Sequence, residues 1–148
     1  YNVGGMFRLA DGVEAELVMT GRTPLPPNPM IPVTSMGQHR RVRYRHFDSH
    51  EEAAQVLKEE GWSLIAVEIA EGAESCFEFV FPPKTCLIIG NEGAGIYGKL
   101  MKAADGCVMI PMFGKGRSLN VTVSAAVVAY QALFGTARSG AIGQALAE

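Results

Sequence analysis

The sequence is poor in cysteine, and its few cysteines are not spaced as metal ligands. Cys76, Cys86 and Cys107 are the only three, and no C-x-x-C pair or His/Cys cluster accompanies them. Cys86 and Cys107 lie inside apolar runs, where a buried, reduced thiol is the usual state. The spacing excludes an ordinary zinc site and a disulfide framework, so we expect no metal and a reducing, cytoplasmic setting.

The chain also lacks a membrane-spanning run and a strong net charge. Its longest strongly apolar stretch, near residues 119–134, is interrupted by polar residues, and no signal peptide is recognisable. The formal net charge is −2, so the chain has no overall positive charge that would indicate a nucleic-acid partner. Because 48% of the 148 residues are hydrophobic, we expect one domain with a real core rather than disorder.

The chain begins "YNVGG", without an initiator methionine or a lead-in strand. We therefore expect that residues 1–148 form one domain whose N-terminal part is missing. Residues 136–148 are expected to form a flexible tail.

Short apolar runs alternate with amphipathic segments along the chain. A proline-rich stretch over residues 22–38 excludes regular structure there, and its length is more typical of a functional loop than of an incidental one. In the segment 118–134 the β-branched residues favour a strand, but its length without a breaker favours a helix. We predict helices over residues 2–12, 49–61, 96–104 and 118–134, and strands over residues 15–21, 41–47, 63–69, 85–90 and 107–112. This alternation predicts an α/β domain with a mainly parallel sheet flanked by helices.

The stretch "LIIGNEGAGIYG" (87–98) matches the dinucleotide-binding pattern G-x-G-x-x-G after an apolar run. The context does not fit, because the following helix is short and the next strand ends in "IPMFGKGRS" rather than in an acidic residue. The negative charge of Glu92 would also repel a pyrophosphate bound in this turn. A second interpretation is that "GNEGAG" and "PMFGKGRS" end successive strands and hold a ligand through main-chain groups. The third is that they are two tight turns.

The segment "HRRVRYRH" (39–46) carries four arginines, two histidines and a tyrosine. It predicts a phosphate-binding strip with Tyr44 as a stacking candidate, or else an edge strand protected by charge. The RNA-binding candidates are Arg40, Arg41, Arg43 and Arg45, extended by Lys115 and Arg117.

Three stretches together resemble the motifs of the SpoU (TrmH-like) branch of the SPOUT RNA methyltransferases. They are "NVGGMFRLAD" (2–11), "LIIGNEGAGI" (87–96) and "IPMFGKGRSLNVTVSAAVVAYQAL" (110–133), in the family's order. The resemblance implies an S-adenosylmethionine-dependent enzyme that methylates a ribose 2′-hydroxyl in tRNA or rRNA and acts as a homodimer. It also implies an α/β-knot fold with a C-terminal deep trefoil knot, in which Gly93 and Gly116 are sites of close chain passage.

Site residues follow from the resemblance, residue by residue. It implies cofactor contacts at Gly90, Ile110 and Leu119, largely through backbone, with Met112 and Gly114 in the same loop. The residues matching the family's catalytic positions are Asn2, Arg8, Glu92, Ser118 and Asn120. We expect the strand that normally precedes Asn2 and any N-terminal RNA-binding extension to be missing from this fragment, which leaves the choice of RNA open.

The role of Arg8 has three interpretations. The family suggests a base, but arginine stays protonated at relevant pH. The more conservative role is to clamp the adjacent phosphate and lower the pKa of the ribose hydroxyl. The third is an ion pair with Glu92. Ser118 is also a candidate N-cap of the long helix.

Two other functions remain alternatives at this point. One is a catalytically inert knotted module that only binds RNA. The other is a nicotinamide-dependent dehydrogenase, which would need an acidic ribose partner that the sequence does not reveal.

Overall fold

The computed structural model describes residues 2–23, 36–37, 40–91, 93–138 and 144–147. The helices in this part of the chain are α1 (Asn2–Val13), α3 (His50–Glu59), α4 (Gly98–Ala103) and α5 (Val121–Arg138). The strands are β1 (Glu16–Thr20), β2 (Tyr44–Phe47), β3 (Ser63–Val67), β4 (Glu74–Ser75), β5 (Thr85–Ile89), β6 (Gly106–Met109) and β7 (Gln144–Ala147).

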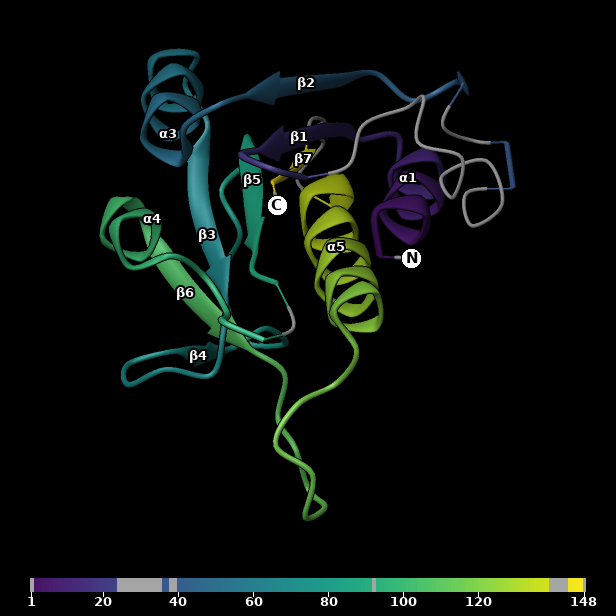
Figure 1. Ribbon diagram of the computed structural model, residues 1–148. Helices are drawn as coiled ribbons and strands as arrows, with labels where there is room; N and C mark the ends of the chain where they lie inside the picture. The colour runs from purple at the N-terminus through teal and green to yellow at the C-terminus, as the bar shows by residue number, and fades with distance from the viewer. Residues whose placement is uncertain (1, 24–35, 38–39, 92, 139–143, 148) are drawn as a thin grey trace.

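The strands form one parallel sheet, which confirms the predicted α/β class. Their order is β2-β1-β7-β5-β3-β6-β4, and each neighbouring pair runs parallel. Helices α1 and α5 lie together on one face, while α3 and α4 lie on the other (Figure 1). Parallel sheets are covered on both faces, which explains the uninterrupted apolar runs of the sequence.

The core divides into two clusters because successive strand residues point to opposite faces. In β5, Leu87 and Ile89 pack with α1 and α5, whereas Cys86 and Ile88 pack with α3 and α4. All five residues of β5 are buried. The strand that precedes the glycine-rich loop is therefore held from both sides, which gives that loop a fixed starting point.

The helix predicted over residues 49–61 is confirmed as α3, which is capped at both ends. The Ser49 hydroxyl accepts the backbone N–H of Glu52 at 3.2 Å, and Gly61 follows the helix at a φ of +92°. A serine at the N-cap satisfies an amide that the helix itself leaves unpaired. A glycine just beyond the helix adopts the left-handed conformation without a Cβ penalty.

The C-terminal part differs from the predicted tail. Helix α5 continues to Arg138, and residues 144–147 form β7 between β1 and β5. A four-residue strand inside a sheet gains hydrogen bonds on both sides, and local pattern gave no sign of them. The proline-rich loop lies mostly outside the described residues, because residues 24–35 and 38–39 are not described.

Between β6 and α5 the chain leaves the body of the molecule. Residues 110–120 contain no helix or strand and form the extension at the bottom of Figure 1. Phe113 is 98% exposed there. None of the described helices is both long and apolar enough to pass through a membrane.

Candidate active site

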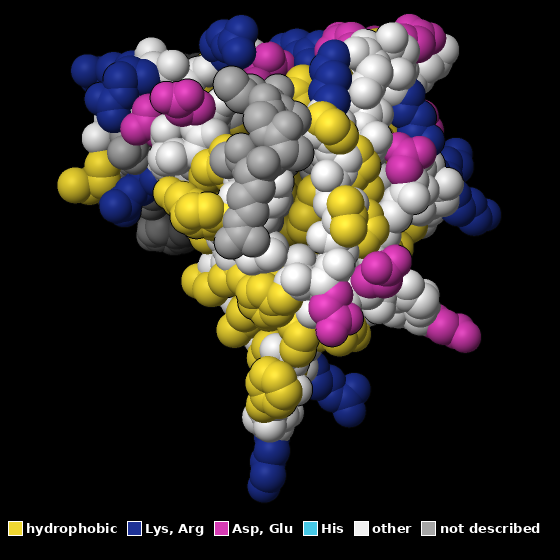
Figure 2. Space-filling model, turned by 180° about the vertical axis from the view of Figure 1, so that it is seen from behind, with side chains coloured by type: hydrophobic (Ala, Val, Ile, Leu, Met, Phe, Trp, Pro, Cys, Tyr) yellow, Lys and Arg dark blue, Asp and Glu magenta, His cyan; other side chains and the backbone are white. Residues whose placement is uncertain are grey.

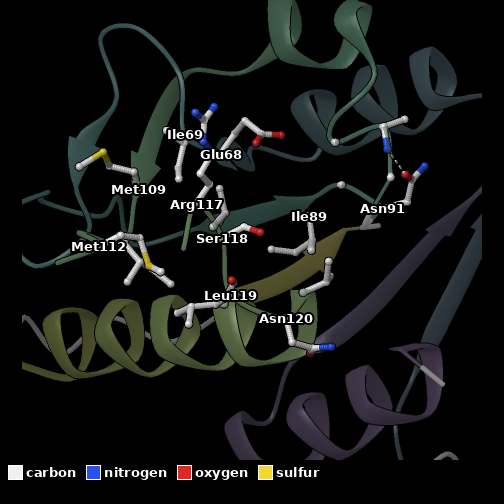
Figure 3. A pocket seen from close by; sticks show the side chains of 18 residues that line it. Glu68, Ile69, Ile89, Asn91, Met109, Met112, Arg117, Ser118, Leu119 and Asn120 are labelled. Atoms are coloured by element: carbon white, nitrogen blue, oxygen red, sulfur yellow. Dashed lines mark hydrogen bonds between the residues drawn. The ribbon is translucent and has the colours of Figure 1, made fainter. Parts of the chain in front are cut away.

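A cavity of about 900 Å³ lies at the carboxyl ends of β3, β5 and β6, beside the start of α5 (Figure 3). Open parallel sheets bind ligands at this edge, and the volume is within the usual range for small-molecule sites. Its described lining comes from residues 67–69 after β3, from residues 89–91 and 93–95 after β5, from residues 109–112 after β6, and from residues 117–124 at the start of α5. Both glycine-rich segments singled out in the sequence therefore reach one cavity.

Most residues predicted to contact a cofactor lie in this lining. They are Gly90, Ile110, Met112 and Leu119, while Gly114 lies outside the lining on the exposed extension. Ser118 and Asn120, predicted as catalytic, also line the cavity, and so does Arg117, predicted to bind RNA. The third motif thus contributes two separate parts of the lining, one after β6 and one at the start of α5.

Gly90 is where two parts of the chain pass each other. A Cβ built at Gly90 would lie 2.3 Å from the carbonyl carbon of Gly95 and 2.5 Å from the nitrogen of Ile96. The close passages predicted at Gly93 and Gly116 are not present among the described residues. Of these residues, only Asn91 would meet a Cβ at Gly93, through Oδ1 at 4.0 Å, and none would lie within 4 Å of a Cβ at Gly116.

The loop after β5 uses its own amides internally. Ala94 N–H donates to Asn91 Oδ1 at 2.7 Å, and Gly95 N–H donates to Asn91 O at 3.0 Å. A dinucleotide turn needs such amides, together with a helix N-terminus, for the pyrophosphate. Helix α4 begins only at Gly98 and has six residues. The geometry therefore disagrees with the dinucleotide interpretation.

Glu68 is a site residue that sequence reasoning missed. It directly follows β3, lines the cavity, and its Oε2 accepts the backbone N–H of Ile96 at 3.2 Å. Its position directly after an apolar run is the one feature of the sequence that points to it. The local pattern does not reveal the strand order, which puts β3 beside β5. The carboxylate gives the cavity a fixed acceptor opposite Leu119 and Asn120 (Figure 3).

Asn120, rather than Ser118, caps α5. Its Oδ1 accepts the backbone N–H of Thr122 at 2.9 Å and that of Val123 at 3.3 Å. An asparagine in this position is among the best helix N-caps. The same side chain therefore starts the helix and faces the cavity.

Arg8, the described catalytic candidate of the first motif, lies apart from this lining. Asn2 is the first residue of α1, and its side chain lies outside the description. Arg8 is exposed on α1, with no ion pair among the described residues. Glu92 is not a described residue, so the predicted Arg8–Glu92 pair lies outside the description. Helix α1 nevertheless approaches α5, because a Cβ at Gly5 would lie 2.9 Å from the Thr122 side chain.

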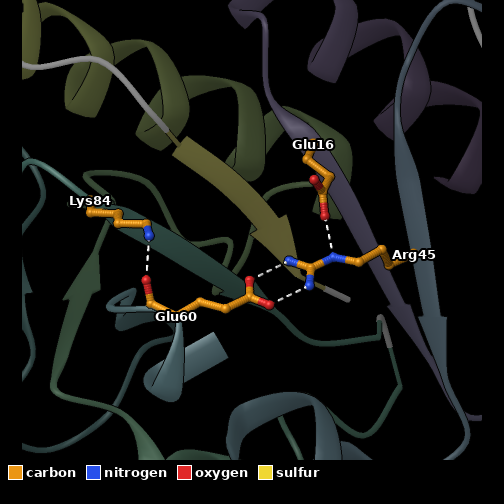
Figure 4. A network of polar contacts seen from close by, with 4 residues as sticks. All are labelled: Glu16, Arg45, Glu60 and Lys84. Atoms are coloured by element: carbon orange, nitrogen blue, oxygen red, sulfur yellow. Dashed lines mark hydrogen bonds and ion pairs between the residues drawn. The ribbon is translucent and has the colours of Figure 1, made fainter. Parts of the chain in front are cut away.

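The arginine strip divides into paired and exposed members. Arg45 donates to Glu16 and forms two hydrogen bonds with Glu60, at 2.7 and 2.9 Å (Figure 4). These carboxylates raise the pKa of Arg45, although burial opposes them. Arg41 donates to Asp11 at 3.0 Å, whereas Arg40 and Arg43 are exposed.

Strand β2 is an edge strand, as the second interpretation of this segment predicted, and pairs only with β1. Tyr44 lies edge-on against Phe7, with ring centroids 5.7 Å apart. Arg45 and Arg41 are thus engaged within the chain, whereas Arg40 and Arg43 have no ion pair with any described residue.

The extension presents the other predicted cations. Lys115 and Arg117 are exposed. Seen from behind, Lys and Arg side chains stand at the end of the extension, while hydrophobic side chains gather around its base (Figure 2). The extension therefore joins an apolar surface to a positively charged tip.

The cysteines are held as thiols. Burial raises the pKa of Cys86 to about 12 and also raises that of Cys76 and Cys107. The Cys107 thiol donates to the backbone oxygen of Glu68 at 3.5 Å. A thiolate nucleophile is therefore not part of this site. Among the described residues, no three His, Cys, Asp or Glu side chains gather as metal ligands would.

Comparison with known proteins places these observations in a family. The family model described as the SpoU rRNA Methylase family matches residues 1–130. A curated relative, the tRNA (guanosine(18)-2′-O)-methyltransferase of Thermus thermophilus, is 35% identical over 136 residues. That alignment covers 89% of this chain and 68% of the relative.

Two solved structures share the fold. A crystal structure of an RNA 2′-O ribose methyltransferase aligns with a TM-score of 0.81 and 30% identity, over 90% of this chain and 51% of that one. The SpoU methyltransferase AviRb from Streptomyces viridochromogenes, in complex with the cofactor AdoMet, aligns with a TM-score of 0.83 and 26% identity. This alignment covers 93% of the chain and 56% of AviRb, so the chain spans about half the length of these proteins.

Proposed function

Because the chain belongs to the SpoU rRNA methylase family, we propose that it is an S-adenosylmethionine-dependent methyltransferase acting on a ribose 2′-hydroxyl of tRNA or rRNA. The observation that carries the proposal is the cavity itself. The second and third motifs, which are separated by 13 residues in the sequence, line one cavity of about 900 Å³ at the carboxyl edge of the sheet. The AdoMet complex of a structurally similar protein supports the same choice of cofactor.

The donor set of the cavity fits this cofactor. Ile89, Ile110 and Leu119 offer apolar surface suited to an adenine ring, while main-chain groups after β5 and β6 offer polar contacts. We assign to Glu68 the ribose hydroxyls, because one carboxylate oxygen already accepts from Ile96 and carboxylates accept several hydrogen bonds.

When bound, S-adenosylmethionine supplies a methyl group on a positively charged sulfur. The chain must hold the incoming ribose oxygen in line with that methyl group, which requires positioning more than covalent chemistry. Ser118 and Asn120 line the cavity just before α5 and are assigned to orient the substrate. A fixed wall made of a capped helix start suits this role, because its side chains lose little freedom on binding.

Arg8 is assigned to the RNA rather than to the cofactor. A protonated guanidinium binds phosphate through two parallel hydrogen bonds, and its charge lowers the pKa of a nearby hydroxyl. Since Arg8 is exposed on α1 and lies outside the cavity lining, we propose that it serves the cofactor cavity of a second subunit. Asn2 and Glu92 are kept as proposed catalytic residues from their match to the family motifs.

We also propose the homodimer, the deep trefoil knot and a cytoplasmic location. The exposed apolar residues of α5 support the dimer. Family membership and the close chain passage at Gly90 support the knot. The raised thiol pKa values are compatible with a reducing compartment.

Two measurements on the full protein test the function. Calorimetry with S-adenosylmethionine should show one binding site per chain. Transfer of a labelled methyl group to unmodified tRNA or rRNA should give a 2′-O-methylated nucleotide on mapping. Cofactor binding without transfer to any RNA would favour the inert module, and absence of cofactor binding would refute the proposal.

The Arg8→Ala variant tests the assignment of the arginine. We expect methyl transfer to fall by at least about 100-fold, since positioned electrostatic groups supply this much in other enzymes. Cofactor affinity should stay within about twofold, because Arg8 is outside the cavity lining. Mixing Arg8→Ala chains with chains that cannot bind cofactor should restore activity in mixed dimers. Wild-type activity of Arg8→Ala would remove Arg8 from the mechanism.

A further inference from the structure

A second cavity of about 280 Å³ lies beside the first one. The two cavities share Ile89, Gly90, Asn91 and Gly95, so the loop after β5 forms a wall of each. The other walls of the second cavity come from the end of β1, the start of α3 and the residues around the start of α4. It is too small for a whole dinucleotide-like cofactor, and its size suits a ligand of one ring system.

Two aromatic rings stand at this cavity. His50 and Tyr97 have ring centroids 5.3 Å apart with an angle of 38° between the rings, and Tyr97 is 49% exposed. A half-exposed aromatic ring at a cavity offers a stacking surface to a flat ligand. Both residues are in the cavity lining.

The imidazole of His50 is held in place from one side only. Its Nδ1 shares a hydrogen bond of 2.7 Å with the hydroxyl of Thr20, a residue that is 4% exposed. Within the described part of the chain, no hydrogen bond reaches Nε2 of His50. The imidazole therefore has a fixed orientation and one nitrogen left for a ligand.

The charge around this cavity is positive. Arg22 lines it, is exposed, and has no ion pair with any described residue. The described lining contains no Asp or Glu. Glu51, on the first turn of α3, pairs with Lys99 of α4 at 3.5 Å and accepts from the Ser49 hydroxyl at 3.0 Å. The guanidinium of Arg22 is therefore not neutralised by an acid in the described wall.

We propose that the second cavity binds an unpaired nucleotide of the RNA substrate, an inference that rests on the proposed function. The base stacks on Tyr97 beside His50, His50 Nε2 hydrogen-bonds the base edge or the ribose, and Arg22 holds a phosphate. Unpaired bases splayed onto aromatic side chains are the usual way in which proteins read single-stranded RNA. The shared loop then has the cofactor on one side and the RNA on the other.

RNA-binding measurements on full-length variants test this site. Tyr97→Ala should weaken the affinity for the substrate RNA by about tenfold, because base–aromatic stacking contributes about this much per base. Tyr97→Phe should bind like the wild type, which separates stacking from a loss of folding. Arg22→Ala should lower the slope of log affinity against log salt by about 0.7, the value for one phosphate on a single strand.

The matched controls are Phe77→Ala and Lys102→Ala, since Phe77 is 56% exposed, Lys102 is exposed and neither lines the cavity. Both should bind RNA like the wild type. Equal losses in the controls, or wild-type RNA binding by both Tyr97→Ala and Arg22→Ala, would overturn the proposal.

A titration with guanosine 5′-monophosphate separates this inference from the proposed function. The imidazole NMR signals of His50 should shift on addition of the nucleotide, and Tyr97→Ala should reduce the shift. If His50 responds and no methyl transfer to RNA is found, the nucleotide site stands and the enzyme assignment fails. If methyl transfer proceeds with an unchanged KM for RNA in Tyr97→Ala, the enzyme assignment stands and the nucleotide site fails.

Discussion

At the scale of single residues, position 90 requires glycine because the backbone of the same loop lies directly against it. The nearest atoms to a Cβ at this position belong to the main chain of Gly95 and Ile96, not to a flexible side chain that could move. Gly95 itself adopts a φ of +69°, which only glycine adopts at no cost. The loop thus closes on itself while it forms the wall of two cavities.

Gly90→Ala should therefore damage both stability and cofactor binding. Forcing a methyl group into this contact costs about 1–3 kcal/mol, as for other overpacked sites. Calorimetry with S-adenosylmethionine should show at least a tenfold loss of affinity. Gly98→Ala is the control, because a Cβ there meets no atom of the described residues within 4 Å. A wild-type affinity in Gly90→Ala would show that the loop can open without consequence.

Asn120 combines two roles that substitutions can separate. Asn120→Ala removes the oxygen that accepts from Thr122 and Val123, which should cost about 1 kcal/mol of folding free energy. For a chain of this length the melting temperature should fall by about 2–4 °C. Asn120→Ser keeps an N-cap acceptor and should recover most of this loss. If methyl transfer remains low in Asn120→Ser, the amide has a role beyond capping, whereas full recovery would reduce Asn120 to a cap.

At the scale of elements, Arg45 joins three parts of the fold. It extends from β2 and is engaged by Glu16 of β1 and by Glu60 at the end of α3 (Figure 4). Lys84, just before β5, donates to the backbone oxygen of Glu60 and lies 4.9 Å from the centre of the Trp62 ring. An edge strand with one neighbour gains a second attachment in this way.

This network makes stability depend on pH. The hydrogen bond from Arg45 lowers the pKa of Glu60 in the folded chain. Between the folded and the unfolded pKa of this carboxyl, the folded chain therefore binds fewer protons than the unfolded chain. The contribution is present above the unfolded pKa of 4.5 and is lost as the pH falls through the lower folded value. Glu60→Gln should reduce the melting temperature at pH 7 and flatten its decline below about pH 4.5.

The control for this prediction is Glu71→Gln, an exposed carboxylate with no ion pair to a described residue. It should leave the melting curve unchanged from pH 7 to pH 3. A Glu60→Gln variant with the wild-type pH profile would show that the pair contributes nothing measurable, as many exposed ion pairs do.

Elements were predictable where the local pattern determines them. The Ser49 cap, Gly61 and the apolar run of β5 follow from hydrogen bonding and burial within a few residues. The sequence predicts Ser118 as a candidate N-cap of α5, and only the geometry shows that the Asn120 side chain accepts from the helix amides. The two-residue β4 and the C-terminal β7 have no local signal, because their hydrogen bonds come from distant strands.

At the scale of the whole molecule, the site depends on strand order. Local pattern placed glycine-rich loops after β5 and β6, and parallel strands bring such loops to one edge. It did not place β3 between those strands, so Glu68 and its contact with Ile96 were not foreseen. In the arginine strip, the composition suggests more phosphate-binding cations than the fold leaves available. Arg45 is engaged by Glu16 and Glu60, which lie 29 and 15 residues away in sequence, so the local pattern does not reveal this pairing.

The last prediction concerns assembly through α5. Val123, Tyr130 and Phe134 are 48%, 43% and 63% exposed. Their separations of seven and four residues put them on one side of α5, where they form an apolar stripe. Such a stripe on the surface of a monomer is typical of a contact with another chain. Under the proposed dimer, this stripe is covered by the partner subunit.

Phe134→Glu should therefore shift the protein from dimer to monomer, measured by light scattering after gel filtration. A charge placed at a buried contact loses its hydration without a partner, which costs several kcal/mol. Phe77→Glu is the matched control, because Phe77 is 56% exposed but lies outside α5, so its variant should remain dimeric. Since Arg8 is proposed to serve the cavity of the second subunit, monomeric Phe134→Glu should keep cofactor binding and lose methyl transfer. A monomer with full activity would place the complete active site within one chain and refute the shared arrangement.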